Sequence, residues 1–211
     1  MGTTVFDIEC RDCPRLADFL DSVKTRFPEY YCRPVPPFGD AQARLLIVGL
    51  APGMHGANRS GRPFTGDHAG ILLYKMLYRY GFASTDQSVS VDDGLTLLDA
   101  RITNAVKCLP PDNKPVGAEI NTCNRYLANE LHTLPADSVV LALGGIAHRA
   151  IIKACGLRQA EFKFGHAALH ELPAFRLLDS YHCSRYNTNT RRLTETMFAG
   201  VFAQARELLD N

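Results

Sequence analysis

The stretch Arg44-Leu-Leu-Ile-Val48, followed by residues 49–67 (GLAPGMHGANRSGRPFTGD), decides the fold expected for this chain. Its apolar first part is typical of a buried strand. Its second part holds five glycines and two prolines, which let a backbone turn sharply and approach a ligand closely. In open α/β sheets, the loops at the carboxyl ends of the strands form the ligand-binding crevice. The stretch therefore predicts a parallel sheet with a binding loop at its carboxyl edge.

This loop does not match the common nucleotide-binding patterns. A P-loop needs Gly-Lys-Ser/Thr, and a dinucleotide-binding loop needs Gly-x-Gly-x-x-Gly; neither occurs in the sequence. A plain turn is the alternative on composition alone. The polar and aromatic residues of the loop instead suit a pocket for a flat polar ring attached to an anionic group: Asn58, Arg59, Arg62, Phe64 and Asp67.

The remainder of the chain alternates strand and helix patterns. Strands are expected at residues 45–50, 101–106, 139–143 and 175–180, and helices at residues 70–80, 119–134, 146–155 and about 192–209. Such alternation produces βαβ units, and hence a mostly parallel sheet with helices on both faces. The segments before Arg44 and between Ala83 and Asp99 look irregular. Residues 1–211 are expected to form a single domain.

The composition limits the classes of function. The formal net charge of +1 excludes a broadly polybasic protein, so nucleic-acid binding would need a local patch. No apolar run is long enough to cross a bilayer, and the start MGTTVFDIEC lacks the features of a signal peptide. We therefore expect a cytoplasmic protein with no membrane association and no obligate protein partner. Five arginines could form the basic patch or be solvated surface residues: Arg59, Arg62, Arg185, Arg191 and Arg192.

Polar residues also follow two further expected strands. Asn104 lies near the end of the second strand, and Ser180-Tyr-His-Cys-Ser-Arg-Tyr-Asn187 follows the last. An asparagine amide can both donate to and accept from the edge of a base. His182 can donate to an oxygen that gains charge during a reaction. Either residue alone is more often structural, but their joint placement at strand ends predicts one site.

The seven cysteines, in a chain without a secretion signal, favour metal binding or buried thiols over disulfides. Cys10 and Cys13 form a C-x-x-C pair, and Cys108 and Cys123 follow the second strand. By count, these four thiols could bind zinc or an iron–sulfur cluster, or could remain buried without a metal. The other three are expected to be a substitute ligand, a core residue and a space-filling residue: Cys32, Cys155 and Cys183, respectively.

Three stretches together resemble the motifs of a uracil-DNA glycosylase: residues 49–67, Thr103-Asn-Ala-Val-Lys-Cys-Leu-Pro-Pro111 and Ser180-Tyr-His-Cys-Ser-Arg-Tyr-Asn-Thr188. GLAPG followed by GRPFTGD resembles the iron–sulfur B type, the fifth family of that superfamily; its A type has an acidic residue where this chain has Leu50. The resemblance covers nearly the whole chain. It implies a three-layer α/β/α domain around a four-stranded parallel sheet. It also implies a 4Fe–4S cluster on Cys10, Cys13, Cys108 and Cys123.

The resemblance implies a monofunctional DNA repair glycosylase. Such an enzyme flips uracil out of double-stranded or single-stranded DNA and hydrolyses its glycosidic bond, leaving an abasic site. Phe64 would stack on the base and Asn104 would read its edge. Asp67 would activate water or stabilise the sugar cation, and His182 would stabilise the departing base. Contacts with DNA are expected for six further residues: His55, Asn58, Arg59, Arg62, Arg185 and Asn187.

Two positions depart from other uracil enzymes of the superfamily. Ala51 stands where those enzymes carry a catalytic aspartate, and Gly53 stands where they place a tyrosine that excludes thymine. Together with Leu50, these small residues predict a roomier base pocket, so we expect activity on hypoxanthine and 5-substituted uracils as well. The alternative is a metal-stapled nucleic-acid-binding module without catalysis, which would have no need of Asp67 or His182.

Overall fold

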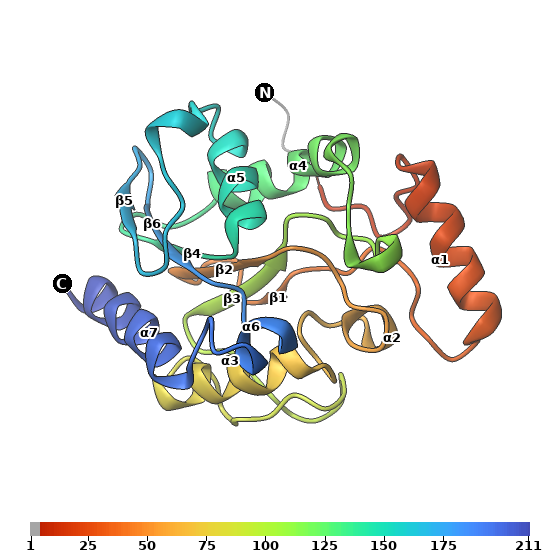
Figure 1. The fold of residues 1–211 in the computed structure, drawn as a ribbon, viewed down its shortest axis with the longest axis horizontal. Helices are drawn as coiled ribbons and strands as arrows, with labels where there is room; N and C mark the ends of the chain where they lie inside the picture. The colour runs from red at the N-terminus through yellow and green to blue at the C-terminus, as the bar shows by residue number, and fades with distance from the viewer. Residues whose placement is uncertain (1–4) are drawn as a thin grey trace.

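The computed structural model describes residues 5–211; residues 1–4, part of the start examined for a signal peptide, lie outside the described range. In the described chain, six strands form one mixed sheet in the order β1-β3-β2-β4-β6-β5 (Figure 1). None of the helices in residues 5–211 is both long enough and apolar enough to span a membrane.

The four central strands correspond to the four expected ones. They are β2 (Leu45–Gly49), β3 (Ala100–Asn104), β4 (Val139–Leu143) and β6 (Arg176–Ser180). Neighbouring strands among them pair in parallel, with Gly49 opposite Asn104 and Leu143 opposite Ser180, so all four end at one edge. The predicted four-stranded parallel sheet is therefore confirmed. Two short antiparallel edge strands, β1 (Phe38–Gly39) and β5 (Leu169–Glu171), were not expected, since they are too short to give a periodic pattern.

Helices cover both faces of this sheet. Figure 1 shows α4 (Gly117–His132) and α5 (Gly145–Ala154) above it, and α3 (His68–Arg79) and α7 (Glu195–Asp210) below it. Successive side chains of a strand point to opposite faces. In β2, Leu45 and Ile47 pack with α3 and α7, whereas Leu46 and Val48 pack with α4 and α5. The three-layer α/β/α architecture is thus confirmed. Two shorter α-helices lie in the connecting segments, α2 (Ala57–Ser60) and α6 (Arg185–Asn189).

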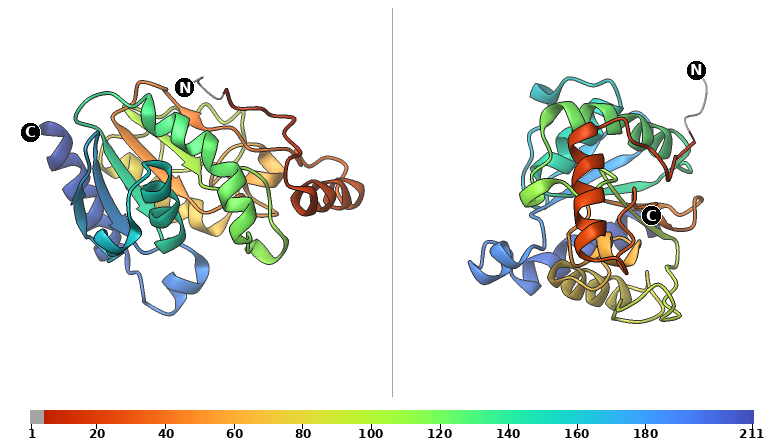
Figure 2. Two further views of the ribbon diagram at one scale, coloured as in Figure 1. Left: turned by 90° about the horizontal axis from the view of Figure 1, so that it is seen from above. Right: turned by 90° about the vertical axis from the view of Figure 1, so that its right-hand side faces the viewer.

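The segment before Arg44 is not irregular, because it contains α1 (Pro14–Arg26). Leu16, Leu20 and Val23 of this helix are buried at helical spacing. The usual start signal is missing, since the residue before the helix is Cys13 and caps no backbone N–H with its side chain. Figure 2 shows α1 at one side of the molecule, where its first turn contacts α4 through the pair of Arg15 and Glu119. The segment between Ala83 and Asp99 has no helix or strand apart from one isolated bridge, as expected.

Candidate active site

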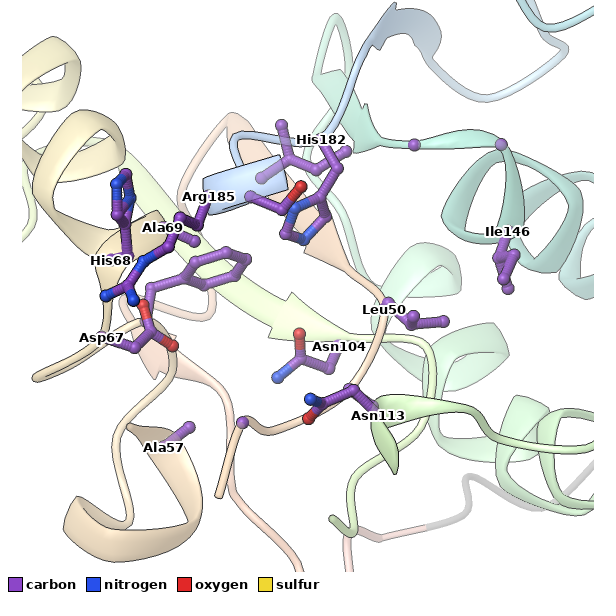
Figure 3. A pocket seen from close by; sticks show the side chains of 17 residues that line it. Leu50, Ala57, Asp67, His68, Ala69, Asn104, Asn113, Ile146, His182 and Arg185 are labelled. Carbon is purple, nitrogen blue, oxygen red and sulfur yellow. The ribbon is translucent and has the colours of Figure 1, made fainter. Parts of the chain in front are cut away.

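A cavity of about 490 Å³ opens at the carboxyl ends of the parallel strands. Each strand contributes to its lining: Leu50 follows β2, Asn104 ends β3, Gly144 follows β4 and His182 follows β6 (Figure 3). The remaining lining residues come from the loop after β2 and from neighbouring turns and helices: Ala51, Gly53, Ala57, Phe64, Asp67, His68, Ala69, Asn113, Leu143, Gly145, Ile146, Ser184 and Arg185. The structure therefore brings the three polar stretches of the sequence together at one cavity.

The glycines of the loop let site side chains lie directly against the backbone. A Cβ added at Gly49 would lie 2.4 Å from Asn104 Oδ1 and 2.7 Å from the ring of Phe64. A Cβ added at Gly56 would lie 2.5 Å from Asp67 Oδ2. Phe64 itself has a φ of 54°, a conformation that costs energy for an aromatic residue. The loop is thus packed around three functional side chains and is more than a plain turn.

Asp67 has two roles in this geometry. Its Oδ1 accepts a hydrogen bond of 2.8 Å from the Gly70 N–H and so caps the start of α3. Its Oδ2 lies 3.5 Å from where a Cβ would stand on Gly53. Burial raises the pKa of this carboxyl above its usual range. Asp67 is the one carboxylate among the described residues that line the cavity (Figure 3).

Three buried polar atoms of cavity-lining residues have no hydrogen-bond partner in the described chain: His68 Nδ1, Asn104 Oδ1 and His182 Nδ1. Leaving a buried polar atom unpaired costs about 1–3 kcal/mol, so three at one cavity are typical of groups kept for a ligand. Burial also lowers the pKa of His182 to about 4, which keeps its ring neutral at physiological pH. The ring lies nearly parallel to Phe64, with centroids 6.0 Å apart and an interplanar angle of 29°.

A family model, the uracil DNA glycosylase superfamily, matches residues 36–206 of the chain. This chain belongs to that superfamily. A type-5 uracil-DNA glycosylase of Thermus thermophilus is 47% identical over 205 residues, covering 94% of this chain and 93% of the relative. One of Pyrobaculum aerophilum is 43% identical over 202 residues, covering 94% and 88%. A type-4 uracil-DNA glycosylase of Archaeoglobus fulgidus is 32% identical over 145 residues, covering 68% and 59%. The resemblance to the fifth family is confirmed.

In this superfamily member, three of the residues expected to contact DNA lie on the surface: His55, Arg59 and Arg185. Arg185 also lines the cavity, as does His68 (Figure 3). The Nδ1 of His55 shares a hydrogen bond of 2.8 Å with the hydroxyl of Tyr30. The half-buried Asn187 instead donates from Nδ2 to the carbonyl oxygen of His182 at 2.8 Å. It therefore holds the backbone that carries the site histidine.

Two expected DNA contacts need correction, because Asn58 and Arg62 are only 0% and 5% exposed. The guanidinium of Arg62 donates to Asp93 at 2.6 Å and to Thr65 at 2.9 Å. Its donors tie the loop after β2 to the segment around Asp93 and do not reach the surface. Asn58 Nδ2 donates to the sulfur of Cys32 at 3.4 Å. Both side chains therefore hold the loop in place.

Sequence reasoning missed several parts of the cavity, among them His68 and Ala69 at the start of α3. The turn Gly144-Gly145-Ile146 follows β4, and its place at a parallel strand end could have revealed it. It was overlooked because it carries no polar side chain. Asn113 lies in a turn where it and Asp112 have φ values of 56° and 54°. Asn113 lines the cavity with Asn104 (Figure 3), and no periodic pattern marks its position.

The four expected cysteine ligands line a second, smaller cavity between α1, β3 and α4: Cys10, Cys13, Cys108 and Cys123. Among the described residues, no three of these thiols have sulfurs within 4.8 Å of one another. Tetrahedral zinc, with Zn–S bonds of about 2.3 Å, would place sulfurs about 3.8 Å apart. The four thiols therefore do not show the spacing of ligands on a single tetrahedral zinc ion.

The remaining cysteines lie elsewhere. Cys32 does not line the cysteine cavity, and its sulfur accepts the hydrogen bond from Asn58. Cys183 is fully buried in the core below the sheet, where it fills space as expected. Cys155 packs, partly buried, against the core above the sheet. None of the three replaces a member of the expected ligand set.

Proposed function

We propose that this chain removes uracil from DNA by hydrolysing the bond between base and sugar, which leaves an abasic site. The observation that carries this proposal is the convergence of Asp67, Asn104 and His182 on one cavity. The relatives named type-5 uracil-DNA glycosylases support the same activity. We propose a monofunctional, single-domain enzyme that acts on double-stranded and single-stranded DNA in the cytoplasm.

We propose that the cavity receives a base that has flipped out of the helix, because a glycosylase cannot reach its target bond inside a duplex. The ring of Phe64 offers an apolar face on which the base can stack. Asn104 Oδ1, which has no partner in the described chain, would accept from the N3–H of uracil. The amide nitrogen would donate to O4, so one side chain would read both groups on that edge.

His182 would act on the departing base. Cleavage leaves negative charge on uracil, and a donor aimed at its O2 stabilises that charge in the transition state. Because burial lowers the pKa of His182 to about 4, the ring would donate as a neutral imidazole at pH 7. Asn187, which binds the His182 carbonyl, would keep this donor in position.

Asp67 would act on the sugar and the water. Cleavage leaves an oxocarbenium-like sugar, which a nearby carboxylate stabilises. Oδ1 of Asp67 already accepts the hydrogen bond that caps α3. We therefore assign the stabilisation of the sugar cation, or the activation of water, to Oδ2. Gly53 and Gly56 leave room beside this oxygen. Asn113 lines the same cavity and would help to orient the water.

We further propose that the enzyme accepts hypoxanthine and 5-substituted uracils. Ala51 and Gly53 have small side chains or none, and a cavity of about 490 Å³ supports a site that is roomy enough for a purine. Arg59, Arg185 and His55, which are exposed, would bind DNA phosphates near the cavity.

We propose that Cys10, Cys13, Cys108 and Cys123 hold a 4Fe–4S cluster. Glycosidic hydrolysis transfers no electron, so its role would be structural, tying the start of α1 to β3 and α4. The purified protein should be brown, with absorbance near about 400 nm. A colourless protein with stoichiometric zinc would overturn this assignment.

The decisive experiment uses three DNA duplexes that contain uracil, hypoxanthine or no lesion. After incubation with the protein, alkali cleaves the DNA at abasic sites. We expect strand breaks in the uracil and hypoxanthine duplexes only. Breaks in the uracil duplex alone would reject the broad specificity, and no breaks in any duplex would favour the non-catalytic binding module.

A further inference from the structure

A second cluster of ionisable side chains is formed by residues of α5, β5 and β6, none of which lines the cavity. It consists of His148 of α5, His170 of β5 and Asp179 of β6, whose nearest ligand atoms all lie within 4.8 Å of one another. Asp179 is 0% exposed and His148 is 1% exposed. We call these three residues the His–Asp cluster. None of them has a role in the chemistry proposed above.

Both ring nitrogens of His148 face oxygen atoms. Nδ1 lies 2.8 Å from Asp179 Oδ1, and Nε2 lies 2.9 Å from the carbonyl oxygen of Phe162. A neutral imidazole has only one N–H, and its other nitrogen carries a lone pair. A neutral ring would therefore set a lone pair against an oxygen on one side or the other. With Asp179 ionised, the geometry therefore favours a positive charge on this ring, supplied by a second proton or by a metal ion on Nδ1.

The distances favour a second proton on His148 over a metal ion. Two ligand atoms on tetrahedral zinc, each about 2.0–2.1 Å from the metal, lie about 3.3 Å apart. The 2.8 Å between His148 Nδ1 and Asp179 Oδ1 is instead a hydrogen-bond length. The other oxygen, Oδ2, lies 3.2 Å from His170 Nε2 and accepts from the Gly165 N–H at 3.3 Å. The carboxylate thus has its partners without a metal.

This carboxylate lies three residues before His182 in the sequence. The backbone of Asp179 also pairs with the loop of residues 162–168: Ala167 donates to its carbonyl at 2.8 Å, and its own N–H donates to Ala168 at 2.9 Å. In the same loop, His166 Nδ1 accepts from the Tyr181 N–H at 3.2 Å. The ring of His166 stacks on Tyr181 with centroids 5.0 Å apart. The loop therefore holds the backbone immediately before His182.

The helix of His148 reaches the same place from the other side. The turn that begins α5 lines the cavity, and a Cβ added at Gly144 would lie 3.4 Å from the Cβ of His182. The Gly144 N–H donates to the carbonyl of Ser180 at 2.8 Å. His148 thus connects the two segments between which His182 emerges.

We propose that His148, held as an imidazolium between Asp179 and the Phe162 carbonyl, is a positioning residue that fixes His182 at the base cavity. This inference rests on the proposed function, since it takes His182 to contact the departing base. Loss of one proton from His148 removes a donor from Asp179 or from Phe162. Either loss loosens the junction of α5, the 162–168 loop and the end of β6.

A positioning role through a charged ring makes excision depend on pH. The charged groups that face His148 are Asp179 of β6, His170 of β5 and Arg149 of its own helix. Burial by itself lowers the pKa of His148, but Asp179 and the Phe162 carbonyl outweigh it and raise the pKa above the ordinary 6.5. His148 is thus fully protonated at low pH and loses its charge as the pH rises through its raised pKa. His182, with a pKa of about 4, is neutral throughout and cannot cause such an alkaline decline.

The protonation state can be measured without any activity. Long-range proton–nitrogen NMR of the wild-type holoenzyme, from pH 6 to 9, should show His148 with both nitrogens protonated at pH 6. Its titration midpoint should lie above 6.5 and coincide with the midpoint of the alkaline decline in uracil excision. A ring that is neutral at pH 6, or two midpoints that do not coincide, would overturn the proposal. If the protein does not excise uracil at all, the proposed function fails, and the NMR result still decides the charge.

The positioning role is tested with His148→Gln, compared with His132→Gln at the exposed end of α4 as the matched control. We expect His148→Gln to slow single-turnover excision about 10-fold at pH 7, since small displacements of a catalytic group are costly, with DNA affinity within about two-fold of wild type. Its alkaline decline should disappear. A lower melting temperature with an unchanged rate and pH profile would reduce the cluster to a structural role and overturn the proposal.

A second variant covers the case in which His148→Gln fails to fold. His170→Gln removes one donor to Asp179 but keeps the pair of His148 and Asp179. It should keep the alkaline decline of the wild type with a reduced maximal rate. A flat pH profile in His170→Gln would assign the titration to His170 and contradict the role of His148.

Discussion

Two histidines on either side of the end of β6 show how burial can have opposite outcomes. His182 is partly exposed at the cavity, but its Nδ1 is buried without a partner in the described chain, and burial lowers its pKa to about 4. His148 is buried between two acceptors, and its pKa rises. The first ring is neutral and free to bind a ligand, whereas the second is charged and fully paired within the protein. At this end of β6, the ring with an unpaired nitrogen thus lies at the cavity, and the fully paired ring lies behind it.

If this distinction holds, residues at the cavity should matter for the rate of excision and little for stability. Residues with complete internal pairing that do not hold a cavity residue, such as Arg62, should matter mainly for stability. The variants below test each half of this statement, from the largest expected effect to the smallest.

Asp67→Asn should have the largest effect. Asparagine caps a helix as well as aspartate does, so α3 should be retained. It cannot act as a base or stabilise a cation, and we expect single-turnover excision of uracil to fall about 10²–10⁴-fold. Asp86→Asn, in the exposed loop before β3, is the matched control. Undiminished excision by Asp67→Asn would remove Asp67 from the mechanism.

The same variant makes a prediction for stability. The folded state raises the pKa of Asp67, so it binds the proton more tightly than the unfolded chain does. Stability from this group is therefore highest at low pH and is lost as pH rises through the raised pKa. Asp67→Asn should increase the free energy of unfolding at pH 7 and leave it unchanged at pH 3, as measured by urea denaturation. A decrease at pH 7 would show that the carboxylate supports the fold.

His182→Ala comes next. Removing one donor to a developing anion slows comparable enzymes about 10²–10³-fold, and we expect a similar loss of single-turnover rate here. Because His182 Nδ1 has no partner in the described chain, the melting temperature should change little. A large loss of stability together with a small loss of rate would place His182 with the paired, structural residues.

Arg62→Ala should show the opposite of His182→Ala, a large loss of stability with little direct effect on the rate of excision. This buried arginine pairs with Asp93, and removing one partner of a buried pair costs about 3–5 kcal/mol of folding free energy. The salt dependence of DNA binding should not change, since the side chain does not reach the surface. A smaller salt slope in Arg62→Ala would restore the original expectation that it contacts DNA.

Arg185→Ala should have the smallest effect. Loss of one phosphate contact should weaken DNA binding several-fold and leave the stability of the protein normal. The slope of the logarithm of the binding constant against the logarithm of salt concentration should fall in magnitude by about one unit. The measurement is the dissociation constant for a uracil duplex at several salt concentrations. Unchanged slopes would remove Arg185 from the DNA-binding surface.

Much of the site could be predicted because its residues follow apolar strands. Gly49–Asp67, Asn104 and His182 were assigned to one sheet edge from their place after strand patterns alone, since parallel strands end together. The turn after β4 obeys the same rule but was overlooked, because glycine and isoleucine give no chemical signal. Arg62 was misassigned because sequence does not show that Asp93, in a distant segment, takes its charge.

The sequence by itself determined the alternation of strands and helices, and hence a parallel sheet with polar residues at its carboxyl edge. It also determined the types of side chain available there. Only the tertiary structure decided which of those side chains are paired and which are free. His148 and His182 are the same residue type, but His148 has two acceptors from other segments of the chain, whereas His182 Nδ1 has no partner in the described chain. The pKa of each follows from that packing, so no local pattern could distinguish the supporting ring from the one that faces the ligand.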